Sequence, residues 1–117
     1  YNIETKTYVN GVTKFLGTGK GSNIYLSQSA FADKETLYLT MGHEILHVKY
    51  NAASKAIRDN TNAQHASIYE WQYNQSKLWN HYNTEFYYSK MLEYRSNFKS
   101  IYEVVNFDFF IQNAKPQ

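Results

Sequence analysis

The stretch DKETLYLTMGHEILHVKY, residues 33–50, decides the fold that the sequence predicts. Its apolar side chains recur at the spacing of one helical face, which carries Leu37, Met41, Ile45 and Val48. Asp33 stands just before this run, and aspartate is among the residues preferred at a helix N-cap. The sequence therefore predicts a long helix that begins after Asp33 and ends at about Tyr50, before Asn51.

The residues before this helix are typical of short strands and tight turns. Residues 3–9, 12–16 and 23–27 alternate between apolar and polar side chains. Asn10-Gly11 predicts a hairpin turn between the first two strands, and glycines at positions 17, 19 and 21 predict a turn before the third. The spacing of these glycines fits neither a phosphate-binding loop nor a dinucleotide-binding loop.

Helices are expected to make up most of the remaining chain. A second helix is predicted from about Asn62 to Trp79, and a third is predicted after an Asn83 cap and through Tyr94. Residues 98–111 are apolar and aromatic, and their pattern is compatible with a strand or a helix. Strands that precede helices predict an α+β fold, and the chain length predicts a single domain over residues 1–117.

The composition excludes several classes of function. The 117 residues include no cysteine, so disulfides and thiol nucleophiles are excluded, and a metal ion would need His, Asp or Glu ligands. The net charge of +2, without a run of like charges, indicates neither nucleic acid nor an anionic membrane as a partner. No apolar stretch approaches the roughly 18 residues that span a bilayer. Because the first residue is Tyr1 and not Met, we expect a processed product or a domain excised from a longer protein. We also expect the protein to be a monomer.

The sequence His43-Glu44-Ile45-Leu46-His47 lies inside the predicted helix and carries the chemistry. Two histidines four positions apart lie about 40° apart on one helical face, so both imidazoles can reach one ion. Neutral imidazole suits zinc, and two such ligands leave room for a third protein ligand and a water molecule. Glu44 lies about 100° around the helix from His43, where its carboxylate can act as a general base on that water.

A third ligand is expected from the second helix. The position ten residues after His43 is Ala53, so the three-histidine spacing of metzincins does not fit. His65 and Glu70 are the two candidates. They lie about 140° apart around the helix, so only one of them can face the metal. Spacing alone leaves the choice between these two residues open.

The motif and the residues before it resemble a known family. His43 to His47, preceded by SNIYLSQSAF at residues 22–31, is similar to the zincin metallopeptidase domains at the C-termini of bacterial RHS-repeat and related polymorphic toxins. In these relatives the third ligand, usually Glu, is followed by a small-Tyr-x-aromatic pattern, and Ile68-Tyr-Glu-Trp71 resembles that pattern. This likeness favours His65 over Glu70. The sequence departs from the family in this histidine and in Lys49, where zincins generally have an uncharged residue. The resemblance covers roughly residues 20–75.

The resemblance implies zinc-dependent peptide hydrolysis with Glu44 as general base. It also implies a Tyr or His that stabilises the oxyanion, for which Tyr69 is the best candidate and His81 or Tyr82 are alternatives. The biological role implied is a secreted bacterial effector that acts on a protein or peptide in a target cell and has a cognate immunity protein. Two other functions stay open, namely a zinc hydrolase with a non-peptide substrate and a binding module that a metal only braces.

Overall fold

A two-stranded antiparallel hairpin begins the part of the chain that the computed structural model describes, residues 10–101. Strand β1 (Gly11–Phe15) pairs with β2 (Ser22–Leu26), and Gly11 lies opposite Leu26. The connection contains three glycines with positive φ angles, Gly17, Gly19 and Gly21. The predicted strands at residues 12–16 and 23–27, and the glycine turn between them, are therefore confirmed to within one residue.

The predicted turn at Asn10-Gly11 is wrong. Gly11 is the first residue of β1, and the backbone carbonyl of Asn10 accepts a hydrogen bond from the amide of Ser27 at 2.8 Å, which extends the pairing with the second strand. The glycine serves packing instead, because a Cβ at position 11 would lie 3.1 Å from the Glu44 side chain. The predicted strand at residues 3–9 lies outside the described residues.

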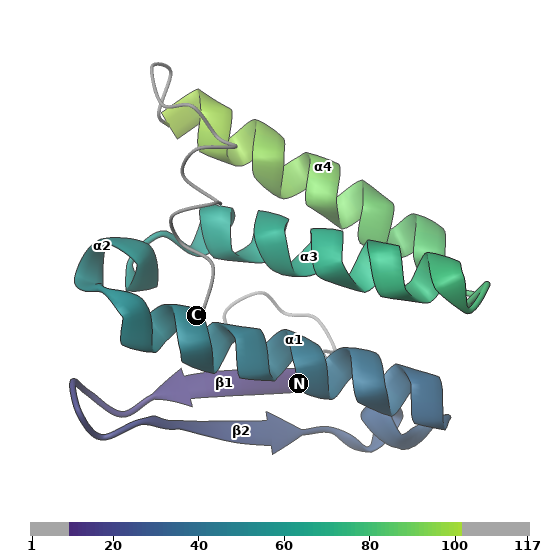
Figure 1. Cartoon of the computed structure of the whole chain (residues 1–117), viewed down its shortest axis with the longest axis horizontal. Helices are drawn as coiled ribbons and strands as arrows, with labels where there is room; N and C mark the ends of the chain where they lie inside the picture. The colour runs from purple at the N-terminus through teal and green to yellow at the C-terminus, as the bar shows by residue number, and fades with distance from the viewer. Residues whose placement is uncertain (1–9, 102–117) are drawn as a thin grey trace.

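Four α-helices follow the hairpin and a short 3-10 turn, and they confirm the α+β fold class. These elements are η1 (Gln28–Phe31), α1 (Lys34–Ala53), α2 (Lys55–Arg58), α3 (Thr61–Leu78) and α4 (Thr84–Ile101). Figure 1 shows the order of the layers: the hairpin lies against α1, α1 against α3, and α3 against α4. Within residues 10–101, no helix combines the length and the apolar character needed to cross a membrane.

Side-chain caps set the beginnings of the helices. The Asp33 carboxylate accepts a hydrogen bond from the Thr36 amide at 2.7 Å, as expected of an N-cap. Asn60 caps α3 in the same way, through the amide of Ala63 at 3.1 Å. The predicted long helices therefore begin within a residue or so of their observed starts.

The ends of the helices were less predictable than their beginnings. Helix α1 continues to Ala53, three residues beyond the predicted end at Tyr50, and the short helix α2 follows at once, capped by Ser54. Helix α4 continues to Ile101, so the first residues of the ambiguous segment are helical. The rest of that segment, residues 102–111, lies outside the described residues.

Small residues allow the three long helices to approach one another. Ala63 and Ala66 of α3 are fully buried and pack with Phe98 of α4. On the other side of α3, the Trp71 ring packs over Gly42 of α1, where a Cβ would lie only 2.0 Å from the ring. Gly42 directly precedes His43, so this close contact sets the distance between α3 and the first histidine of the motif.

We expect Gly42→Ala to destabilise the fold, although alanine favours helix by about 1 kcal/mol over glycine. The added methyl group overlaps the Trp71 ring, and overpacking of this kind costs about 1–3 kcal/mol. Thermal unfolding followed by circular dichroism measures the net effect as a lower Tm. In a Trp71→Leu background the same substitution should cost less, and an equal or higher Tm for Gly42→Ala in the wild-type background would contradict the packing.

Candidate metal centre

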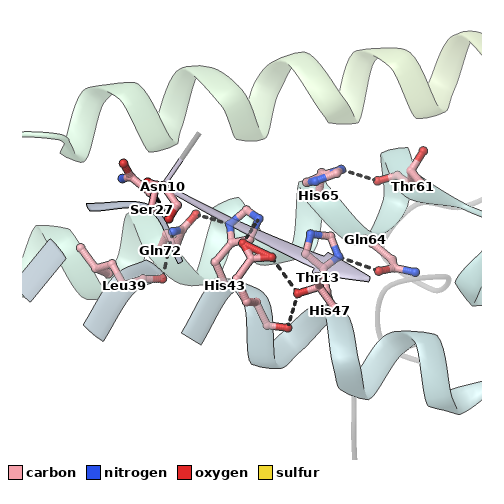
Figure 2. Close-up of polar contacts among 11 residues, drawn as sticks. Asn10, Thr13, Ser27, Leu39, His43, His47, Thr61, Gln64, His65 and Gln72 are labelled. Atoms are coloured by element: carbon pink, nitrogen blue, oxygen red, sulfur yellow. Dashed lines mark hydrogen bonds and ion pairs between the residues drawn. The ribbon is translucent and has the colours of Figure 1, made fainter. Parts of the chain in front are cut away.

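Helices α1 and α3 bring three histidines together. His43 and His47 lie one turn apart on α1, and His65 reaches them from α3, which runs antiparallel to α1 (Figures 1 and 2). The ring centroids are 4.9 Å apart for His43 and His47, 4.7 Å for His47 and His65, and 5.8 Å for His43 and His65. One nitrogen atom from each ring lies within 4.8 Å of the other two. The three side chains therefore form a cluster that could hold a metal ion.

Each imidazole is hydrogen-bonded through Nδ1 to an oxygen atom of α3. His43 Nδ1 lies 2.9 Å from Gln72 Oε1, His47 Nδ1 lies 2.8 Å from Gln64 Oε1, and His65 Nδ1 lies 3.0 Å from the carbonyl oxygen of Thr61 (Figure 2). Amide and peptide oxygens only accept hydrogen bonds, so each Nδ1 carries the proton and donates it. This tautomer leaves the Nε2 lone pair of each ring free to bind an ion.

Burial keeps the three rings in the neutral form that a metal requires. Burial, together with the neighbouring His47, lowers the pKa of His43 to about 3 and that of His65 to about 4. The pKa of His47 is also lowered, mainly by burial. A ligand that is already deprotonated at neutral pH binds a cation without first losing a proton.

Glu44 brings a carboxylate to the edge of this cluster. The residue is only 4% exposed, and burial raises the pKa of its carboxyl group. The hydrogen bond from Thr13 lowers this pKa and so offsets part of the rise. The Thr13 hydroxyl on β1 lies 2.7 Å from Glu44 Oε1, while Glu44 Oε2 lies 3.9 Å from His43 Nε2. One oxygen of the carboxylate is thus held by the hairpin, and the other faces the imidazole nitrogen that is free to bind a metal.

Aromatic rings from α3 and α4 form a wall beside the histidines. The ring of Tyr69 lies 5.2 Å from that of His43, measured between centroids. Tyr94 of α4 stacks on both His65, at 4.7 Å, and Tyr69, at 5.7 Å. Burial raises the pKa of the Tyr69 hydroxyl, so this group stays protonated and able to donate a hydrogen bond.

Glu70, the other candidate for the third ligand, lies away from the cluster. Glu70 Oε2 forms an ion pair with Arg95 Nη2 of α4 at 3.5 Å, where both side chains are partly exposed. Within the described residues, the group that could bind a metal contains His65 and not Glu70. That His65 is the third ligand stays a prediction. The geometry places its side chain next to those of His43 and His47.

His81 and Tyr82 belong to the connection between α3 and α4. They contact the N-terminus of α1, about two turns before the motif. His81 Nε2 lies 3.2 Å from the Thr36 hydroxyl, and the Tyr82 hydroxyl donates to Asp33 Oδ2 at 2.8 Å. The Asn83 amide donates to His81 Nδ1 at 3.1 Å, which fixes the ring with its proton on Nε2. These two residues join the α3–α4 connection to the N-terminus of α1, and of the three candidate oxyanion donors only Tyr69 has a ring contact with the cluster.

The donor set fits zinc. Three neutral imidazoles are common ligands of this ion, and a site with three protein ligands keeps a fourth position for water or substrate. One ring nitrogen from each histidine lies within 4.8 Å of the other two, a spacing at which all three could reach one ion. The cluster is therefore a candidate metal centre in which the ion itself is not identified.

Three residues that form hydrogen bonds with the candidate site residues were not predicted from the sequence. Thr13, Gln64 and Gln72 contact Glu44, His47 and His43. The only signal was that Gln64 and Gln72 lie near His65 on the predicted second helix, and glutamine is common on exposed helical faces. Only the packing of α1 on α3 shows that both amides are buried.

We expect His65→Ala to weaken zinc binding by more than tenfold, because it removes one of the three imidazoles that could bind the ion. Glu70→Ala is the matched variant on the same helix and should leave the zinc affinity unchanged, since Glu70 pairs with Arg95. Titration against a chromophoric chelator measures both affinities. The reverse ranking would show that Glu70 moves into the site when metal binds.

Comparison with known proteins does not identify a relative. The sequence matches no protein-family model, and neither a curated protein nor a solved structure matches it. The likeness to zincins therefore rests on the motif and its neighbouring residues, while the histidine cluster rests on the geometry of α1 and α3.

Proposed function

We propose that this protein is a zinc-dependent hydrolase that cleaves peptide bonds, with His43, His47 and His65 as zinc ligands and Glu44 as general base. The observation that carries the proposal is the position of the Glu44 carboxylate. A metal that only braces two helices needs no additional buried carboxylate beside its ligands, and burying such a group is costly. A hydrolase needs one there, since a base must lie next to the water that attacks the substrate.

The hydrogen bonds support a separate chemical role for each group at the site. A zinc ion at the three Nε2 atoms would acidify a water molecule and polarise the carbonyl group of the substrate. Glu44 Oε2 faces that position and accepts the proton of the attacking water, while the Thr13 hydroxyl holds Oε1. The same carboxyl group then donates the proton to the leaving amine, and the upward shift of its pKa through burial strengthens it as a base in the first step.

Tyr69 is the proposed oxyanion donor. Its ring contacts that of His43, and burial keeps its hydroxyl protonated by raising its pKa. A protonated hydroxyl beside the metal can donate to the negative oxygen that develops as water adds to the carbonyl carbon. Stacking on Tyr94 limits the rotation of the ring, which favours a donor that is already oriented.

The biological setting is proposed from the sequence resemblance alone. The likeness to metallopeptidase domains of bacterial polymorphic toxins supports a secreted effector that acts on a protein in a target cell and is blocked by an immunity protein. A non-peptide substrate on the same scaffold is the competing possibility.

Glu44→Gln should abolish peptide hydrolysis, with a loss of about 10²–10⁴-fold in kcat, while zinc binding is retained. The amide keeps the size of the side chain and its contact with Thr13 but cannot accept the proton. Cleavage of a peptide library, followed by mass spectrometry, measures the activity, and metal analysis measures the zinc. Glu70→Gln is the control, and equal cleavage by the Glu44 variant and the wild type would refute the enzyme proposal.

Thr13→Val should lower kcat by about tenfold without changing zinc affinity, because it removes the hydrogen bond that orients Glu44 but retains the shape of the side chain. Thr13→Ser keeps the hydroxyl and should retain most of the activity. The same cleavage assay, run on both variants at saturating peptide, separates kcat from KM. Similar rates for the Val and Ser variants would show that the hydroxyl does not position the base.

A further inference from the structure

We propose that Gln64 and Gln72 are positioning residues of the metal centre, and that their neutral amides hold the affinity for the ion below the level that carboxylates in their place would give. The proposal rests on the three-histidine metal site proposed above. It goes beyond that site because it proposes that two residues outside the ligand set control the affinity of the site for the ion.

Gln64 is held in one orientation from both ends of its amide. Oε1 accepts from His47 Nδ1 at 2.8 Å, and Nε2 donates to the Ile57 carbonyl at 2.9 Å and to Asn51 Oδ1 at 3.1 Å. The two acceptors lie in α1 and α2, so the amide spans the join between these helices. Because the Nε2 donors are committed to these oxygens, the amide cannot flip, and it presents only an acceptor to His47.

Gln72 holds the other motif histidine in the same way. Oε1 accepts from His43 Nδ1 at 2.9 Å, and Nε2 donates to the carbonyl oxygen of Leu39 at 3.1 Å, one turn before His43 on α1. Gln64 and Gln72 are each only 4% exposed. Both histidines of the motif are therefore oriented by buried amides from one helix, α3.

The chemistry of these acceptors affects the metal. A histidine ligand usually donates its second N–H to a carboxylate, a backbone carbonyl or water, and a carboxylate raises the basicity of the nitrogen that binds the ion. Here the acceptors are two amides and the Thr61 carbonyl, all of them neutral. An ion at this site would keep more of its positive charge than one backed by carboxylates. It would bind less tightly and act more strongly on water and on a carbonyl group.

The test is the zinc affinity of the intact protein, measured by competition with a chromophoric chelator at about pH 8, where unperturbed histidines are neutral. Gln64→Leu and Gln72→Leu remove the acceptor, and each should bind zinc about 10–100-fold more weakly. Gln64→Glu and Gln72→Glu replace the neutral acceptor by a charged one, and each should bind zinc about tenfold more tightly than the wild type. Gln75→Leu is the matched control on α3 and should leave the affinity unchanged.

A purely structural role for the two amides predicts a different result. In that case the Leu and Glu variants would lose thermal stability without metal, and zinc affinity would follow stability and not the charge of the acceptor. The Tm of each metal-free variant is therefore measured beside its affinity. Leu variants that bind zinc like the wild type, or Glu variants that bind no more tightly than it, would overturn the proposal.

This outcome is independent of peptide cleavage, since no substrate is present. Zinc affinities that follow the predicted order in a protein without peptidase activity would refute the proposed function and support the inference. Peptidase activity in a protein whose variants all bind zinc with the same affinity would support the proposed function and refute the inference.

Discussion

The packing of α1 against α3 is the contact on which the rest of the structure depends. Gly42 lets the Trp71 ring approach the backbone of α1, and the next residue is the first histidine of the motif. At this separation the amides of Gln64 and Gln72 reach across to the imidazoles of His47 and His43. The same helix pair therefore forms both the core and the histidine cluster, and a change in its spacing would act on both.

Burying so many polar groups in a small domain is costly unless each is hydrogen-bonded. The structure meets this requirement with neutral groups, because lowered pKa values keep the imidazoles uncharged and the two glutamines supply the acceptors. The exception is Glu44, for which burial raises the pKa of the carboxyl group and Thr13 offers a single hydroxyl. The burial of the Glu44 carboxyl group costs free energy that the hydrogen bond from Thr13 offsets only in part. A chemical role explains such a group more readily than a contribution to stability.

The features that the sequence predicted correctly depend on neighbouring residues. Asp33 caps α1 through the amide of Thr36, three positions away, and glycines between the strands supply the positive φ angles of the turn. The spacing of His43 and His47 predicted a shared face for the same local reason. The local signal failed at Asn10-Gly11, because Gly11 pairs with Leu26 of β2 and a side chain at this position would lie close to Glu44, which is distant in sequence.

The unpredicted parts of the site join residues that are distant in sequence. Thr13 and Glu44 are 31 positions apart, His43 and Gln72 are 29 apart, and His47 and Gln64 are 17 apart. Each pair meets only through the tertiary packing, and neither Thr nor Gln has a sequence pattern that marks it as a partner of Glu44 or of the histidines. The two arrangements use different elements: the three histidines and the oxygen atoms that accept from them lie on α1 and α3, whereas the proposed base is oriented by β1. A domain that only bound a metal would not need the second arrangement.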